Sequence, residues 1–194
     1  MSKVAIAAYG AGNLASVVNA LERLGANAVI ATNANELLAA DRVIFPGVGH
    51  ATQAMTMLKE RSLSEAIGDF KQPLLGICLG MQLLGKRSEE GNTTGIGALN
   101  FEVKRFDVSL KIPHMGWNTI QEPRGKLFDG IPSETYFYFV HSYYVPVIPT
   151  ATARCTYEFS FAAAVEQGNF FGVQFHPEKS GDAGMQLLEN FLKL

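Results

Sequence analysis

The chain has 194 residues, 47% of them hydrophobic, and its 16 basic and 18 acidic residues nearly cancel. This length suits one sizeable domain over residues 1–194. Because the charges are dispersed, the composition excludes the basic footprint of a nucleic-acid-binding protein. The apolar N-terminal stretch is too short to cross a bilayer and has no signal-peptide cleavage pattern, so we expect a cytoplasmic protein without a membrane partner.

The first half of the chain alternates short apolar segments with segments of helical periodicity. Asn13 is a predicted helix N-cap, and Gly25 follows the end of the same helix. Expected strands cover Val4–Tyr9, Ala28–Thr32, Arg42–Phe45 and Leu74–Cys78, and expected helices cover 14–24, Ala51–Arg61, Leu63–Phe70 and Met81–Lys86. This alternation predicts an α/β fold, a flavodoxin-like open and mostly parallel sheet with helices on both faces.

The pattern changes between Phe101 and Gln174 to short strands and turns. The clearest expected strands there are Tyr136–Val140 and Phe170–Phe175. A closing helix carries four apolar residues on one face, Met185, Leu188, Phe191 and Leu192. We therefore expect one α/β domain whose second half is rich in β-structure.

A glycine-flanked cysteine carries the sharpest local signal. Cys78 lies between Gly76 and Gly80 at a predicted strand-to-helix junction. Flanking glycines permit the tight bend that raises a nucleophile above a sheet, as in the related G-x-S-x-G turn. A position at a helix start also favours the reactive thiolate. The alternative is a small buried hydrophobic residue between two packing glycines, and the motif alone does not decide. Cys155, in an apolar strand-like segment, is expected to be buried and inert.

A reactive thiol needs a base, and the chain has only four histidines. His176 comes directly after an apolar strand, which delivers its ring to the edge of the sheet. Glu178 follows two residues later and can orient the ring by accepting from its second nitrogen. The alternative is a surface His–Glu pair at a strand end. His141 is expected to be structural or interfacial.

The sequence Gly-Ile-Cys-Leu-Gly-Met-Gln around Cys78, together with Phe-His-Pro-Glu around His176, resembles the class I (triad) glutamine amidotransferase family. The separation of the two motifs and their order are also similar to that family. The resemblance implies that Cys78 attacks the side-chain amide of L-glutamine and forms a γ-glutamyl thioester. It implies that His176 acts first as base and then as acid, while Glu178 holds the ring in the required tautomer.

The tetrahedral intermediate needs donors directed at its oxyanion. The N–H of Leu79, just after the nucleophile, is one candidate, and the resemblance assigns the other to Val48 in Phe45-Pro-Gly-Val-Gly49. We expect the Val48 peptide to rest turned away and to flip when the partner is occupied; the alternative is a plain glycine turn. The resemblance also implies four residues of the glutamine pocket, Gly49, Gln82, Ser142 and Tyr143.

Two further segments, Tyr9–Val17 and Pro113–Asn118, are similar to the glutaminase-subunit family of imidazole glycerol phosphate synthases in histidine biosynthesis. The variant Pro46–Gly49 is similar to it too. The similarity implies a heterodimer with a (β/α)₈-barrel cyclase subunit. Ammonia passes through that barrel to a nucleotide acceptor, which gives imidazole glycerol phosphate and aminoimidazole carboxamide ribonucleotide. We expect low glutaminase activity alone and strong stimulation by the liganded cyclase.

Four residues are candidates for the interface with that cyclase, namely Asn13, Trp117, Tyr138 and Lys179. Aromatic residues are enriched at interface centres, and Trp117 is the only tryptophan. The alternatives are a core aromatic for Trp117 and a solvated charge for Lys179.

Other functions fit the sequence less well. The segment Gly10–Ala15 matches G-x-G-x-x-A, but a dinucleotide site needs an acidic residue at the end of the second strand. Thr32 and Asn33 occupy that place, and Glu36 comes late. A non-catalytic module would lack a triad member. The glutaminase of pyridoxal phosphate synthesis also docks on a barrel, but its Gly-Gly-Glu-Ser stretch is missing. Because metal-ligand spacings are absent, we expect neither a metal nor a cofactor.

Overall fold

A computed structural model describes residues 3–10 and 12–194. Met1, Ser2 and Ala11 lie outside the described residues, so one position of the Gly10–Ala15 segment is not placed. The largest element is a seven-stranded sheet with the order β11-β12-β13-β4-β3-β1-β2. Its members are β1 (Lys3–Ala7), β2 (Asn27–Ala31), β3 (Arg42–Gly47), β4 (Leu74–Cys78), β11 (Ala151–Tyr157), β12 (Phe159–Gln167) and β13 (Phe170–Val173).

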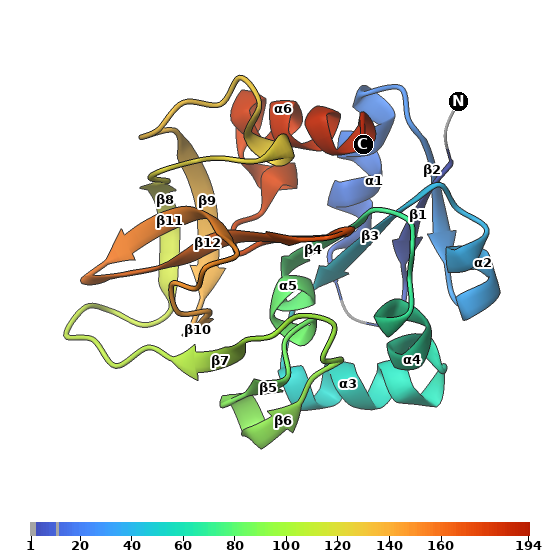
Figure 1. Ribbon diagram of the computed structural model, residues 1–194, viewed down its shortest axis with the longest axis horizontal. Helices are drawn as coiled ribbons and strands as arrows, with labels where there is room; N and C mark the ends of the chain where they lie inside the picture. Colours follow the sequence, from blue (N-terminus) through green and yellow to red (C-terminus); the bar gives the residue numbers. More distant parts are fainter. Residues whose placement is uncertain (1–2, 11) are drawn as a thin grey trace.

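The strands β2, β1, β3, β4 and β13 run parallel, whereas β11 and β12 form an antiparallel extension at one edge (Figure 1). Counting β13 as the fifth parallel strand gives the order 2-1-3-4-5 of flavodoxin-like folds. The predicted fold class, an open and mostly parallel sheet, is therefore confirmed.

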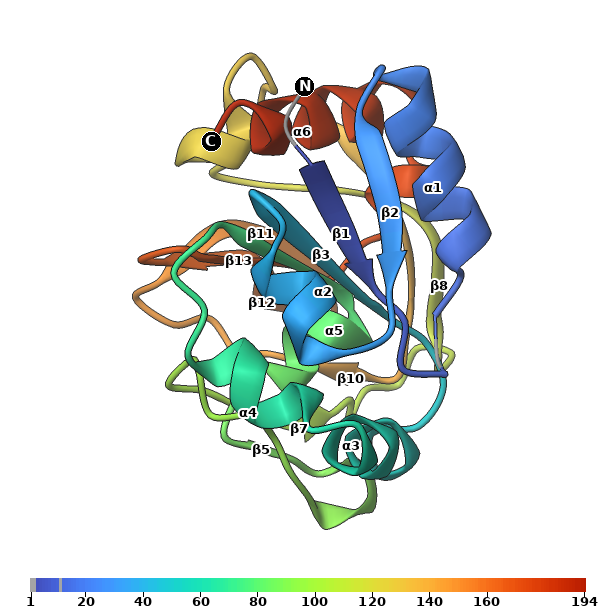
Figure 2. The ribbon, with the colours of Figure 1, turned by 90° about the vertical axis from the view of Figure 1, so that its right-hand side faces the viewer.

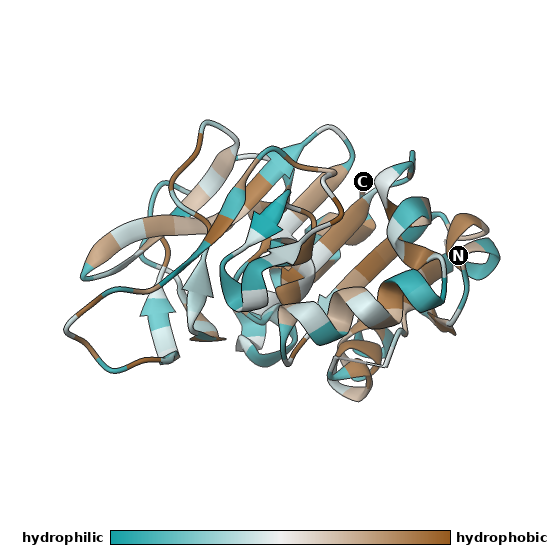
Figure 3. Cartoon of the chain, turned by 90° about the horizontal axis from the view of Figure 1, so that it is seen from below, coloured by the Kyte–Doolittle hydropathy of each residue, from teal (hydrophilic) through white to brown (hydrophobic). Residues whose placement is uncertain are grey.

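Helices cover both faces of this sheet, because its central strands are apolar on both sides. The helices are α1 (Leu14–Arg23), α2 (Ala34–Leu38), α3 (Ala51–Glu60), α4 (Leu63–Gly68), α5 (Leu79–Leu83) and α6 (Gly181–Leu192). Buried side chains of α1 and α6 form one core with Val4 and Ile6 of β1, and those of the other helices form a second core with Ala5 and Ala7. Figures 1 and 2 show α1 and α6 on one side of the sheet, and Figure 3 shows strongly hydrophobic central strands.

The predicted β-rich second half is also present. A four-stranded sheet pairs β10 (Tyr143–Tyr144), β7 (Glu102–Arg105), β5 (Arg87–Ser88) and β6 (Thr93–Thr94), and a separate hairpin pairs β8 (His114–Thr119) with β9 (Tyr136–His141). The described residues also form three 3₁₀ turns, η1 (Glu90–Asn92), η2 (Lys126–Phe128) and η3 (Pro177–Lys179). No helix in the described ranges has the length and apolarity needed to cross a bilayer.

The helix expected over Met81–Lys86 is misplaced, because it begins at Leu79 and ends at Leu83. Tertiary packing ends it early: a Cβ at Gly85 would lie 2.4 Å from the Phe101 ring, and the Lys86 N–H donates to the Phe101 carbonyl at 2.8 Å. Several other predicted boundaries differ by one or two residues. Asn13 is the N-cap of α1, since its side chain accepts from the Ser16 N–H at 3.4 Å.

Close packing around Gly80 gives the first prediction. A Cβ at this position would lie 1.8 Å from the Phe45 carbonyl oxygen of β3, which is backbone and cannot rotate away. We expect Gly80→Ala to lower the free energy of unfolding by about 1–3 kcal/mol. The matched control is Gly68→Ala, whose Cβ would meet only Ile96 at 3.7 Å. Urea unfolding measures both, and equal stability of the two variants would contradict this packing argument.

Candidate active site

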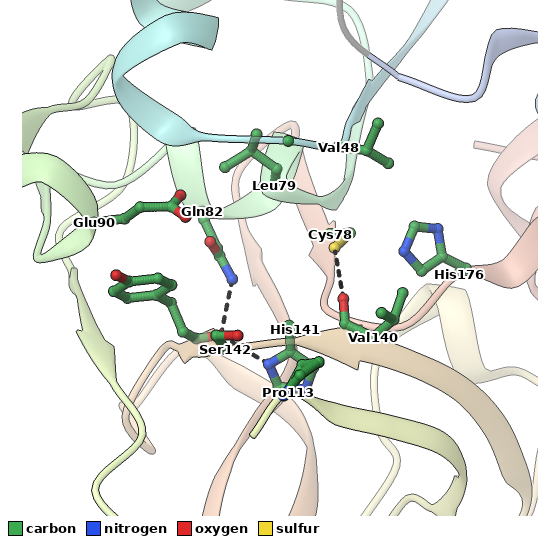
Figure 4. A pocket seen from close by; sticks show the side chains of 12 residues that line it. Val48, Cys78, Leu79, Gln82, Glu90, Pro113, Val140, His141, Ser142 and His176 are labelled. Carbon is green, nitrogen blue, oxygen red and sulfur yellow. Dashed lines mark hydrogen bonds between the residues drawn. The ribbon is translucent and has the colours of Figure 1, made fainter. Parts of the chain in front are cut away.

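Three neighbouring parallel strands end at the same edge of the sheet and bring the candidate residues together. Cys78 is the last residue of β4, Val48 follows β3, and His176 follows β13 shortly after its last residue. Because β4 lies between β3 and β13, its end is flanked by both of the other segments. Figure 4 shows the ring of His176 beside the Cys78 sulfur, with Val48 nearby. Residues distant in sequence therefore share one site at the carboxyl ends of strands, where open α/β sheets bind ligands.

The backbone at Cys78 makes the tight bend that the flanking glycines predict. Its φ of 54° and ψ of −112° lie in a region that residues with a Cβ rarely occupy. A Cβ at Gly76 would lie 2.8 Å from the backbone of Met81, and Gly80 has no room for one either. Cys78 is 7% exposed and lies at the junction of β4 and α5.

His176 and Glu178 form a buried pair beside the thiol. The Nδ1 of His176 lies 2.8 Å from Glu178 Oε1, and the two side chains are 2% and 1% exposed. Because a carboxylate only accepts, Nδ1 carries a proton, which leaves Nε2 as the variable nitrogen. Among the described residues, Nε2 has no hydrogen-bond partner. Nε2 is therefore the nitrogen that is free to exchange a proton with the nucleophile of a triad.

Two neighbouring side chains favour the protonated form of this ring. Burial lowers the pKa of His176, but Cys78 and Glu178 outweigh it and raise that pKa to about 10. The raised pKa means that the site favours the imidazolium form of His176 beside Cys78. Such a pair is the activated-nucleophile arrangement of cysteine enzymes.

A cavity of about 300 Å³ opens beside Cys78. Its size is at the lower end for small-molecule sites. Every residue predicted for the oxyanion donors or the glutamine pocket borders it, together with two triad members and four further residues. The lining residues are Val48, Gly49, Cys78, Leu79, Gln82, Glu90, Pro113, Val140, His141, Ser142, Tyr143 and His176.

The residues of both predicted oxyanion donors border the cavity, as does Cys78. Leu79 is the first residue of α5, and the N–H groups of a first helical turn have no acceptor within the helix. Val48 is 40% exposed and precedes Gly49, whose φ of 95° suits only glycine. Their positions bordering the cavity are compatible with the assigned roles, which stay predictions.

Glu90, Pro113 and Val140 line the cavity without having been predicted. The Glu90 carboxylate enters from η1, where it accepts the Ala51 N–H at 2.8 Å. Its position depends on a turn that lacks any periodic signal, so the sequence alone gave no means of finding it.

His141 is buried and supports the wall of the cavity, as expected for a structural histidine. Its Nδ1 donates to the Tyr143 carbonyl at 2.7 Å, so its Nε2 accepts from Nδ1 of His114 at 3.0 Å. The remaining nitrogen of His114 accepts from the Asn118 amide at 3.2 Å. These bonds fix both rings as neutral tautomers.

Three of the four interface candidates form a cluster beside the site. Trp117 and Tyr138 are cross-strand partners with ring centroids 6.1 Å apart, and Lys179 Nζ lies 5.9 Å from the Tyr138 centroid. Trp117 is 54% exposed, so the alternative of a core aromatic is wrong. Asn13 is the N-cap of α1, a helix that contacts η3. Elsewhere, the Glu36 carboxylate accepts from the backbone N–H and the hydroxyl of Thr32, four residues earlier in the chain.

The chain matches the family model of glutamine amidotransferase class-I over residues 6–194. The imidazole glycerol phosphate synthase subunit HisH of Bacteroides fragilis is 50% identical over 195 residues, which cover 99% of this chain and 100% of the relative. The protein of the same name from Yersinia pestis is 51% identical over 194 residues, covering 98% and 99%.

Solved structures share the fold. A glutamine amidotransferase superposes with a TM-score of 0.78 at 21% identity, covering 98% of this chain and 97% of that chain. PurLQS from Thermotoga maritima gives a TM-score of 0.75 at 18% identity, covering 100% and 99%.

The neutral histidine pair gives the second prediction. Burial lowers the pKa of His114 to about 4 and, with smaller effects of neighbours, that of His141 to about 3. Their contribution to stability is complete above about pH 6.5, the ordinary value, and is lost as the pH falls toward these lowered values. Between about pH 7 and about pH 4.5, we expect the free energy of unfolding to fall less steeply in His114→Gln than in the wild type.

Urea unfolding at several pH values measures this slope. His50→Gln, at an exposed histidine on the N-cap of α3, is the matched control. A slope in His114→Gln as steep as that of the wild type would contradict the assignment.

Proposed function

Because the chain belongs to the class-I glutamine amidotransferase family, we propose that it hydrolyses L-glutamine as the glutaminase subunit of an imidazole glycerol phosphate synthase. The observation that carries this proposal is that Cys78 and His176 meet at one cavity, while Glu178 holds the His176 ring by a hydrogen bond of 2.8 Å. The relatives bearing that subunit name align over almost their full length with this chain. Their name is the reason for preferring this synthase to another ammonia-consuming enzyme.

The reaction proceeds through a thioester. The Cys78 thiolate attacks the side-chain carbonyl carbon of glutamine and forms a carbon–sulfur bond. His176 then gives its proton to the departing nitrogen, and ammonia leaves as the carbon–nitrogen bond breaks. Next, His176 takes a proton from water, whose oxygen attacks the thioester and releases glutamate and the thiolate. Glu178 keeps Nδ1 protonated throughout, so that Nε2 always handles the moving proton.

The oxygen of each tetrahedral intermediate carries negative charge. The N–H groups of Leu79 and Val48 stabilise it, with an effect of about 3–4 kcal/mol for one such donor in a comparable enzyme. Gly49 permits the Val48 peptide to turn, and its φ of 95° places the chain in a region open to glycine. A flip of this peptide on binding the partner accounts for the low activity expected of the isolated chain.

The opposite end of the cavity binds the amino-acid part of glutamine. Ser142 and Tyr143, at the junction of β9 and β10, contribute mainly backbone groups. The Glu90 carboxylate provides the negative charge that an α-ammonium group needs. Gln82, between this end and Cys78, contacts the chain of the substrate.

The exposed face of the β8–β9 hairpin is the docking surface for a (β/α)₈-barrel cyclase in a heterodimer. Trp117, Met115 and Tyr136 are 54%, 63% and 59% exposed, and an apolar patch of this kind marks an interaction site. Tyr138 pairs with Trp117 and lies beside Lys179, and Asn13 caps α1, a helix that contacts η3. The sealed contact matters because free ammonia protonates in neutral water and loses its nucleophilicity. The complex works in the cytoplasm and forms imidazole glycerol phosphate and aminoimidazole carboxamide ribonucleotide.

The third prediction concerns the nucleophile. We expect Cys78→Ala to lower glutamine hydrolysis by about 10⁴-fold or more, because no thioester forms. Cys155→Ala is the matched control, since Cys155 is fully buried and burial raises its pKa to about 12. Glutamate release is measured for the chain alone and with the cyclase and its nucleotide ligand.

Two outcomes would overturn this account. Hydrolysis that survives in Cys78→Ala removes the thioester mechanism. Turnover of the isolated chain as fast as that of the complex removes the dependence on a cyclase.

The fourth prediction tests Glu90. Because the neutral amide of Glu90→Gln keeps an oxygen for the Ala51 N–H but loses the charge, we expect KM to rise about 10-fold or more with kcat nearly unchanged. Glu89→Gln, at the exposed neighbouring carboxylate, is the control and should keep the wild-type KM. An unchanged KM in Glu90→Gln would exclude an ionic contact with the α-ammonium group.

A further inference from the structure

We infer that Gln174 is a buried positioning residue that donates a hydrogen bond to the Cys78 sulfur and fixes which end of the Gln82 amide faces the substrate. The inference rests on the proposed function, because it takes Cys78 as the nucleophile. Gln174 has no place in the proposed triad and does not line the cavity.

The position of Gln174 is unusual for a polar side chain. It directly follows β13 and is 0% exposed, between Val173 and Phe175, which are also fully buried. Its backbone N–H donates to the Ala163 carbonyl at 2.8 Å, which anchors it beside β12. A carboxamide removed from water in this way is costly unless both of its ends find partners.

Both ends do find partners, and both partners belong to the site. The Nε2 of Gln174 lies 3.7 Å from the Cys78 sulfur, and its Oε1 lies 2.8 Å from the Nε2 of Gln82. The same Gln82 nitrogen lies 3.0 Å from the Tyr143 carbonyl (Figure 4). One chain of amides therefore connects the wall of the cavity with the nucleophile.

The Tyr143 carbonyl fixes the direction of every bond in this chain. A carbonyl only accepts, so the NH₂ end of Gln82 must face it. That NH₂ group gives its second hydrogen to Gln174, whose oxygen must then face Gln82. The NH₂ end of Gln174 is left for the sulfur. His141 holds the same carbonyl from the other side through its Nδ1, at 2.7 Å.

The direction of the last bond affects the charge state of the sulfur. A hydrogen bond donated to a thiolate stabilises the charged form. The Val140 carbonyl, 3.8 Å from the same sulfur, can only accept, so it favours the protonated thiol. Gln174 offsets this preference from a fully buried position outside the lining of the cavity.

The same chain determines what Gln82 offers to a ligand. Both hydrogens of its amide nitrogen are committed to Tyr143 and Gln174, so its oxygen is the end left for the cavity. An oxygen accepts from the N–H groups of a carboxamide but repels a carboxylate. The site thereby favours bound glutamine over the glutamate that it produces.

The fifth prediction tests the donor to the sulfur by alkylation. Iodoacetamide reacts with thiolate, so its rate with Cys78, followed against pH in a Cys155→Ala background, gives the midpoint of thiolate formation. Gln174→Met keeps the length of the side chain and removes the donor. We expect its midpoint to move to higher pH by about one unit, which is the effect of losing a hydrogen bond to a charged group.

Two further variants complete this experiment. Gln167→Met, at an exposed glutamine at the end of β12, is the matched control and should keep the wild-type midpoint. Gln82→Met leaves Gln174 in place but removes the group that fixes the orientation of the Gln174 amide. Because that amide can then rotate, we expect a smaller shift of the midpoint to higher pH. This variant decides the matter should Gln174→Met fail to fold, as judged by circular dichroism.

An unchanged midpoint in the folded variants would overturn the role of Gln174. Failure of the proposed function looks different: glutamine hydrolysis by the complex would then survive complete alkylation of Cys78. If alkylation abolishes hydrolysis while the midpoint is independent of Gln174, only the present inference falls.

Discussion

The constraint on which the site depends is the backbone conformation of Cys78 at the junction of β4 and α5. A residue with a Cβ at φ 54° and ψ −112° costs of order 1–3 kcal/mol and persists only where its surroundings enforce it. The neighbouring strands β3 and β13 provide that enforcement, because they hold β4 on both sides in parallel ladders. Gly80 lets the following helix approach the Phe45 carbonyl, and this approach completes the bend. The strained turn and the parallel strands beside it therefore fix the position of the sulfur together.

The two histidines that border the cavity differ in charge. His176 and Glu178 form a buried pair whose imidazolium form is favoured. His141 faces the same cavity but stays neutral, because burial lowers its pKa to about 3 and the nearby His176 adds to this effect. A second imidazolium in this place would repel the imidazolium of His176. The neutral histidines instead brace the Tyr143 carbonyl, which in turn orients Gln82 and Gln174.

Much of this arrangement could be predicted from the sequence, because strand ends in a parallel sheet meet at one edge. Cys78 and His176 each follow an apolar segment, so their meeting required only the correct strand order. Gln174 was not predicted as a site residue, because it is a single polar residue within the apolar strand expected over Phe170–Phe175. Side chains two residues apart in a strand point to the same face, so its spacing from His176 was a usable signal. Glu90 gave no such signal, since a 3₁₀ turn and its contact with Ala51 bring it to the cavity.

The central claim is that the sulfur of Cys78 becomes acylated by glutamine. Mass spectrometry of the complex, quenched with acid during turnover and digested, measures this claim directly. The account predicts a glutamyl adduct on the peptide that contains Cys78 and an unmodified peptide around Cys155. Steady glutamine turnover with no adduct on Cys78, under conditions in which a synthetic thioester survives the quench and digestion, would contradict it.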